Sequence, residues 1–103
     1  MSLAKKYKWY KVAEKLADIG FAANGMAEVM VDNKKVCIVL YNEVLMACSQ
    51  KCPHAGGVMA HGYIDVLGNI VCPLHQYKFN LQNGKNVSGE GYYLKTWPVE
   101  MRE

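Results

Sequence analysis

Residues 52–75 read CPHAGGVMAHGYIDVLGNIVCPLH, a stretch that begins with CPH and ends with CPLH. The first segment supplies Cys52 and His54, and the second supplies Cys72 and His75. Thiolate sulfur and imidazole nitrogen are the ligands that zinc and iron–sulfur centres take from proteins. The two segments therefore predict one metal centre with four ligands, held between two loops.

The residues between the two segments can bring them together. Residues 62–66 and 69–72 have the composition of short strands, and Leu67 and Gly68 form a turn between them. A hairpin at this place returns the second loop to the side of the first. The two loops can then close on the centre from opposite sides.

The spacing inside the first segment bears on which metal is bound. A single residue separates Cys52 from His54, whereas paired ligands of structural zinc sites usually have a gap of about two to four residues. Such close ligands fit better on different irons of a cluster, although zinc stays open as an alternative. A proline after each cysteine stiffens both loops, and Gly56 and Gly57 allow backbone amides to approach the cluster sulfurs.

The order of these residues resembles the signature of the Rieske iron–sulfur family, including both prolines and the glycine pair. The similarity covers nearly the whole chain, from a leading segment with Trp9, through residues 36–48, to a closing strand at residues 94–99. The resemblance implies a single domain over residues 1–103, with a β-sandwich base and a cluster-binding subdomain at about residues 49–79.

The resemblance also implies the ligand set and the cofactor. One iron of a single [2Fe–2S] cluster takes Cys52 and Cys72, and the other takes His54 and His75, which lie near the surface. Because neutral imidazoles replace two thiolates, the cluster is less negative and accepts an electron more readily. Loss of the outer imidazole protons from the oxidised protein is expected to lower the potential as pH rises in the alkaline range.

Four positions differ from the high-potential Rieske proteins of respiratory complexes. Gly57 and Leu74 stand where those relatives carry two cysteines joined as a disulfide. Tyr77 and Phe79 stand where they place a serine and a tyrosine hydroxyl near the cluster. With fewer donors to the sulfurs, we expect a potential near the low end of the roughly −150 to +300 mV Rieske range. The sequence is similar to soluble ferredoxins of oxygenase systems and to the small subunit of assimilatory nitrite reductase.

The rest of the sequence predicts short strands between turns. Residues 36–40 are all apolar, which is typical of a central strand covered on both faces. Asp32-Asn33-Lys34 and Asn83-Gly84 indicate hairpin turns, and a helical turn is expected only around residues 13–18. About eight to ten short strands predict an all-β sandwich or a partly open barrel. The expected strands are residues 8–12, 26–31, 35–41, 44–48, 62–66, 69–72, 78–81, 85–87 and 92–97.

Composition and charge exclude several other classes of protein. The 103 residues are 51% hydrophobic and 20% charged, an ordinary globular balance. The longest apolar run, residues 36–41, is far shorter than the roughly 20 residues that cross a bilayer. The first eleven residues lack the apolar stretch of a secretory signal, so we expect a cytoplasmic protein. The net charge of +3 includes five lysines in the first fifteen positions, which we interpret as a solvated strand edge and not as a nucleic-acid site.

These features predict a one-electron carrier. We expect a monomer that takes an electron from a reductase and docks on an oxygenase or another acceptor enzyme through its histidine-bearing tip. Lys51 and Lys78 flank the two loops and are expected to favour acidic partners. A fixed small subunit of a nitrite reductase is the closest alternative, and a non-redox module with a zinc or an empty site is a more distant one.

Few other side chains are candidates for chemistry. After the four ligands are assigned, His61 is the only histidine left, too few for the second iron site of an oxygen-activating enzyme. We expect it to be exposed on a loop. Cys37 and Cys48 are expected to be buried free thiols, and Trp97 is expected to anchor the core. No catalytic set is recognisable, so we expect no enzymatic activity in this chain alone.

Overall fold

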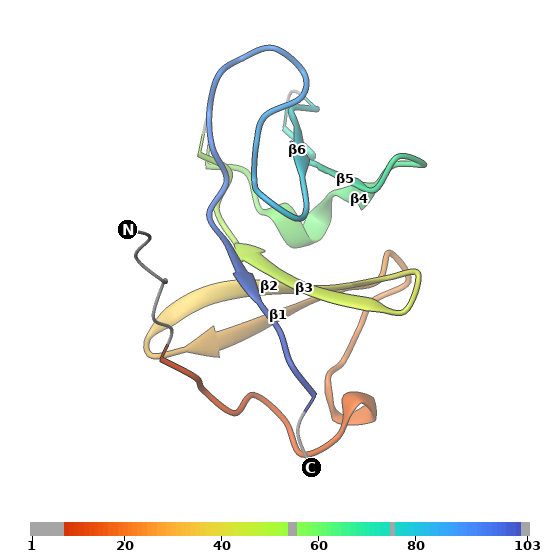
Figure 1. The fold of residues 1–103 in the computed structure, drawn as a ribbon, viewed down its shortest axis with the longest axis vertical. Coiled ribbons are helices and arrows are strands. Elements are labelled where there is room, and N and C mark those ends of the chain that lie inside the picture. Colours follow the sequence, from red (N-terminus) through yellow and green to blue (C-terminus); the bar gives the residue numbers. More distant parts are fainter. Residues whose placement is uncertain (1–7, 54–55, 75, 102–103) are drawn as a thin grey trace, which may run out of the picture.

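The computed structural model describes residues 8–53, 56–74 and 76–101, which form two antiparallel sheets and two short 3-10 turns (Figure 1). The elements are η1 (Leu16–Asp18), β1 (Met26–Val31), β2 (Lys34–Tyr41), β3 (Val44–Ser49), η2 (Met59–His61), β4 (Tyr63–Ile64), β5 (Asn69–Val71), β6 (Lys78–Asn80) and β7 (Thr96–Pro98). The larger sheet has the order β1-β2-β3-β7, and the smaller has the order β4-β5-β6. No helix among these residues is long and apolar enough to cross a membrane. The all-β prediction is confirmed.

Two-residue turns join the first three strands. Asp32 and Asn33 have φ values of 49° and 63°, and Asn42 and Glu43 have φ values of 49° and 67°. Positive φ at both central residues is the mark of a type I′ turn, whose twist matches that of the flanking strands. The first turn is one residue shorter than expected, because Lys34 already pairs with β1.

β2 separates two apolar cores, as the pattern of residues 36–40 predicted. Cys37 and Val39 face the main core, whereas Val36 and Ile38 point to the opposite face. There they form a second core together with Ala47 from β3. The main core also contains Met26, Cys48, Cys52, Met59, Ala60, Ile70, Cys72, Phe79, Leu81 and Leu94. Because it takes residues from both sheets, the larger sheet directly supports the two candidate cysteine ligands.

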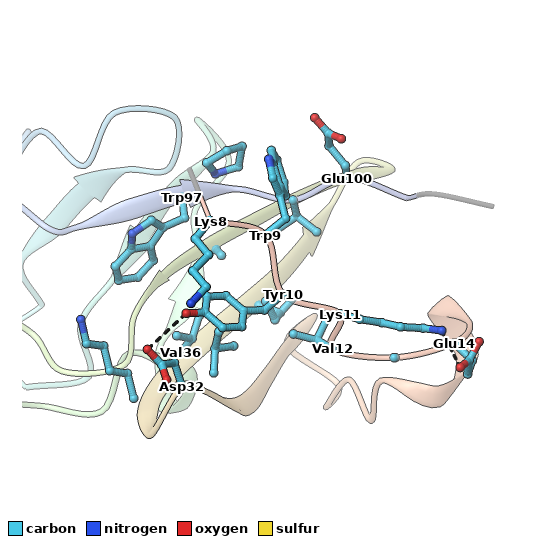
Figure 2. A pocket seen from close by; sticks show the side chains of 17 residues that line it. Lys8, Trp9, Tyr10, Lys11, Val12, Glu14, Asp32, Val36, Trp97 and Glu100 are labelled. Carbon is cyan, nitrogen blue, oxygen red and sulfur yellow. Dashed lines mark hydrogen bonds and ion pairs between the residues drawn. The ribbon is translucent and has the colours of Figure 1, made fainter. Parts of the chain in front are cut away.

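The expected first strand at residues 8–12 is wrong. This segment is irregular and lines a groove together with residues of the second core (Figure 2). The segment thus lies over a face of the larger sheet instead of pairing with one of its edges. Trp9 and Tyr10 are 42% and 41% exposed. Trp97, from β7, is half-buried against the second core, so its predicted role as a core anchor is confirmed.

The expected strands at residues 85–87 and 92–97 are only partly formed. Isolated bridges replace the first, and β7 covers the end of the second. In this region Asn86 Oδ1 accepts hydrogen bonds from the backbone N–H groups of Glu90 and Gly91, at 2.6 and 3.1 Å. Such bonds compete with a strand ladder. The described residues therefore form seven strands instead of eight to ten, while the other expected strands and the helical turn are confirmed.

Candidate metal centre

The first candidate loop follows β3 and closes on itself. The Cys52 N–H donates to the Gly57 carbonyl at 2.8 Å, and the Gly56 N–H donates to the Cys52 carbonyl at 3.1 Å. Lys51 and Val58 pair through an isolated bridge at the base of the loop. Cys52 is only 2% exposed and belongs to the main core. The loop therefore holds this cysteine in the interior.

The second candidate loop follows β5 and closes in a similar way. The Cys72 N–H donates to the Tyr77 carbonyl at 2.9 Å. Gln76 has a φ of 57°, a left-handed conformation that turns the chain back. The predicted ligands His54 and His75 lie outside the described residues, and within the described ranges no group of three or more possible metal ligands occurs. The described part of the site is therefore the pair of cysteines.

The two loops lie in direct contact at Gly57. A Cβ atom at this position would lie 2.8 Å from the Cys72 Sγ and 3.1 Å from the Leu74 Cβ. Carbon atoms in favourable contact stay about 3.5–4.0 Å apart, so glycine is needed for the first loop to lie against the Cys72 thiol. The hairpin between the loops returns the second one as predicted.

The Cys72 thiol is buried beside the Cys52 thiol. Burial raises the pKa of the Cys72 thiol to about 11, and the neighbouring Cys52 thiol adds to this rise. A hydrogen bond from the Leu74 backbone N–H favours the thiolate and therefore opposes the rise. A pair of thiolates in such a buried place needs a compensating positive charge. Iron would supply that charge, and its binding would displace the thiol protons. The chemistry of these donors therefore fits an iron–sulfur cluster.

Two polar side chains that the motif did not indicate hold η2 beside the site. Asn24 Nδ2 donates to the carbonyls of Ala60 and Gly62 at 2.9 and 3.0 Å, and Gln50 Oε1 accepts from the Ala60 N–H at 3.1 Å. Gln50 Nε2 is buried and has no hydrogen-bond partner among the described residues. Buried donors are usually satisfied, and a cluster sulfur is one acceptor that would satisfy it. No signal in the sequence distinguishes these amides, because their partners are backbone groups far along the chain.

Three further candidates have the environments that we expected. Cys37 and Cys48 are free, fully buried thiols that face each other across β2 and β3. A hydrogen bond with Cys37, and then burial, raise the pKa of Cys48. His61 is exposed, and its Nε2 lies 3.4 Å from the Glu28 Oε1, a contact that the sequence did not predict.

The residues after the second loop differ in their surroundings. Phe79 is completely buried in the main core, and Tyr77 stacks on a second tyrosine with ring centroids 6.3 Å apart. The Lys78 Nζ lies 3.7 Å from the Asp65 Oδ2. Lys51, by contrast, forms no ion pair with a described residue. The two lysines predicted to favour acidic partners, Lys51 and Lys78, are therefore not equivalent.

Two antiparallel sheets that present paired, buried cysteines on touching loops define a small β domain suited to an iron–sulfur centre. Residues 8–98 match the family described as "Rieske [2Fe-2S] domain". Because the match spans most of the 103 residues, the chain belongs to the Rieske family. Its cofactor is accordingly one [2Fe–2S] cluster per chain.

Known proteins similar to this chain include ferredoxins of dioxygenases and a putative nitrite reductase subunit. It is 28% identical over 69 residues to the 3-phenylpropionate/cinnamic acid dioxygenase ferredoxin subunit of Photorhabdus laumondii, a match that spans 66% of each chain, just under two thirds. The ferredoxin of carbazole 1,9a-dioxygenase from Nocardioides aromaticivorans IC177 is 22% identical, with a TM-score of 0.75 over 88% of this chain and 86% of that one. A putative small subunit of an NADPH nitrite reductase is 23% identical, with a TM-score of 0.77 over 91% of each chain. The two solved structures share the fold of this chain.

Proposed function

We propose that this protein is a cytoplasmic carrier that passes single electrons from a reductase to an oxygenase or another redox enzyme. The observation that carries the proposal is a pair of buried cysteines on touching loops of a Rieske fold. When bound, the [2Fe–2S] cluster supplies a reversible one-electron change. The residues of the chain bury the thiols, exclude water on their side and fix the loops. In this proposal the chain binds no substrate.

The proposed ligands are Cys52 and Cys72 on one iron and His54 and His75 on the other. Replacement of Cys72 or His75 by alanine is expected to abolish the visible absorption and the bound iron and sulfide, because each change removes one ligand. Cys48→Ala is the matched control, since Cys48 is a buried cysteine of the same core, and it is expected to keep the cluster. An intact cluster in Cys72→Ala would contradict the ligand assignment.

Residues 49–79 are proposed to act as the cluster-binding subdomain, with its histidine-bearing tip as the docking surface. The hydrogen bonds of Asn24 to the Ala60 and Gly62 carbonyls support this proposal, because they fasten this segment to the rest of the chain. An anaerobic titration with dithionite tests the function: the protein is expected to take up one electron per chain and to pass it to cytochrome c. Failure of either step would contradict the carrier function.

A second candidate function is that of a fixed small subunit of a nitrite reductase. The similarity in fold to a putative subunit of this kind favours it. Size-exclusion chromatography of a cell extract separates the two functions. A free carrier is expected to elute alone as a monomer, whereas a fixed subunit co-elutes with a larger oxidoreductase.

A further inference from the structure

A second groove lies beside the first candidate loop and is rich in lysine. Its volume is about 490 Å³, and no aspartate or glutamate is among the described residues that line it. Ser49 and Trp97 line it from the larger sheet, and Gly56 lines it from the loop. Its lysines are Lys34, Lys35, Lys51 and Lys95, and we refer to it as the lysine groove.

The positive charge of the lysine groove is not balanced by a carboxylate among the described residues that line it. All four of its lysines are exposed, and none forms an ion pair with a described residue. Elsewhere Lys11 and Lys78 lie 2.5 and 3.7 Å from carboxylate oxygens. The net charge of the chain is +3 and the four lysines of the groove contribute +4, so the remaining residues together carry a net charge of −1. The groove therefore concentrates the positive field of the protein at one place.

The lysine groove is directly connected to the loop that contains Cys52. A Cβ atom at Gly56 would lie 3.0 Å from the Lys51 Cε, so the Lys51 side chain lies against this loop. At the other side, the Ser49 N–H donates to the Lys95 carbonyl at 2.9 Å, which fixes the backbone between β3 and β7. A partner held by these lysines would consequently lie next to the proposed cluster.

We propose that the lysine groove adds to the docking surface of the histidine-bearing tip and binds an acidic protein, namely a redox partner of this carrier. This inference rests on the proposed function, because the position of the groove beside the first loop explains why a redox protein would bind there. Carboxylates of the partner would approach unpaired ammonium groups, which raises the association rate and orients the complex. The groove is a short hollow without arginine, whose planar fork is the usual choice for recognising phosphate. These features favour an acidic protein over a nucleic acid or an anionic membrane.

The groove also continues along the larger sheet. Lys34 and Trp97 line both the lysine groove and the groove beside residues 8–14 (Figure 2). The groove beside residues 8–14 has Glu14, Asp32 and Glu100 among its lining residues, so the surface there carries both charges. The unbalanced positive charge therefore lies in the lysine groove itself.

Electron transfer to a charge-matched pair of acceptors tests this proposal. Cytochrome c carries many lysines, and succinylation converts them to carboxylates without changing the haem. The reduced holoprotein is expected to react faster with the succinylated form at low salt, and this advantage should fall about tenfold as the Debye length shrinks from about 30 Å to 8 Å. Preference for the native, basic cytochrome would overturn the proposal.

Charge reversal in the groove provides the specific test. The double change Lys35→Glu and Lys51→Glu is expected to slow the reaction with succinylated cytochrome c about tenfold at low salt. The matched control is Lys15→Glu with Lys85→Glu, two exposed lysines outside the groove, since both pairs change the net charge from +3 to −1. Equal slowing by the two pairs would overturn the proposal, because net charge alone would then explain the effect.

A binding measurement that does not depend on the cluster separates the two proposals. Fluorescence anisotropy of a labelled poly-glutamate peptide is expected to show binding that the groove pair weakens at least severalfold more than the control pair. Tighter groove-dependent binding of a labelled DNA duplex, or of vesicles that contain phosphatidylserine, would overturn the choice of a protein partner. If neither the wild type nor any variant reduces either cytochrome, but groove-dependent binding of the peptide persists, the carrier function is refuted. The assignment of the lysine groove as a binding surface for acidic protein is then retained.

Discussion

Gly57→Ala tests how closely the two loops must approach. The added Cβ would lie 2.8 Å from the Cys72 Sγ, and 3.1 Å from the Leu74 Cβ. The first distance is at least about 0.7 Å shorter than an ordinary contact between carbon atoms, and sulfur is larger still. Overpacking of this kind costs about 1–3 kcal/mol, which lowers the melting temperature of a domain of this size by roughly 5–20 °C. The backbone of Gly57 is not in the left-handed region, so the cost arises from the contact alone.

The same displacement is expected to loosen the metal centre. If the Cys72 thiol moves by a few tenths of an ångström relative to the first loop, the ligands no longer meet in one geometry. Purified Gly57→Ala is expected to contain less iron and sulfide and to lose iron to a chelator severalfold faster than the wild type. Gly20→Ala is the matched control, because no atom lies within 4 Å of its Cβ position. Equal iron content and equal melting temperatures in the two variants would refute the reasoning.

Three other perturbations follow from the same contacts. Asp65 accepts hydrogen bonds from the backbone N–H groups of Leu67 and Asn69; although burial raises its pKa, these bonds and Lys78 outweigh burial and lower it. Because the pKa of Asp65 is lower in the folded protein, the ionised carboxylate stabilises the fold above the ordinary value of about 3.9, and this stability is lost as the pH falls below it. Asp65→Asn should therefore have a lower melting temperature at pH 7, and its melting temperature should change less with acid pH. An unchanged dependence of the melting temperature on acid pH would contradict this. Asn24→Ala removes two bonds to η2 and should cost about 1–3 kcal/mol in a denaturant titration, whereas a loss below a few tenths would show that η2 is held by packing alone. The reduction potential, measured by potentiometric titration, should lie near the low end of the Rieske range of roughly −150 to +300 mV and should decrease as pH rises in the alkaline range. A potential well above zero would contradict the expected effect of Tyr77 and Phe79 in place of the serine and tyrosine hydroxyls. A potential that does not change with alkaline pH would count against the histidine ligands.

The strands and turns that the sequence predicted well are those with local signals. Asp32-Asn33 and the apolar run at residues 36–40 are sufficient to place β1, β2 and their hairpin. Residues 8–12 have the composition of a strand, but the structure places them over a sheet face. Residues 85–87 pair with β6 only in part, through two backbone hydrogen bonds and an isolated bridge. The Asn86 side chain binds the N–H groups of Glu90 and Gly91, a local interaction that strand propensity does not capture.

The sequence motif predicted those parts of the candidate site that depend on residue type and spacing. The cysteines and Gly57 follow from residue type and spacing, and the structure brings Gly57 against Cys72. Asn24 and Gln50 were not predictable, because their role depends on backbone groups that only the fold brings near. The lysine groove was missed for the same reason: its lysines come from three separate segments, and the sequence pointed only to Lys51 and to the ion-paired Lys78.

Electron paramagnetic resonance of the reduced protein tests the central claim most directly. Protein produced with ample iron and sulfide, kept free of air and treated with dithionite, should show the rhombic signal of a reduced cluster with two cysteine and two histidine ligands. The oxidised sample should be red-brown and contain iron and sulfide in equal amounts. A colourless, zinc-containing protein without a signal would contradict the account.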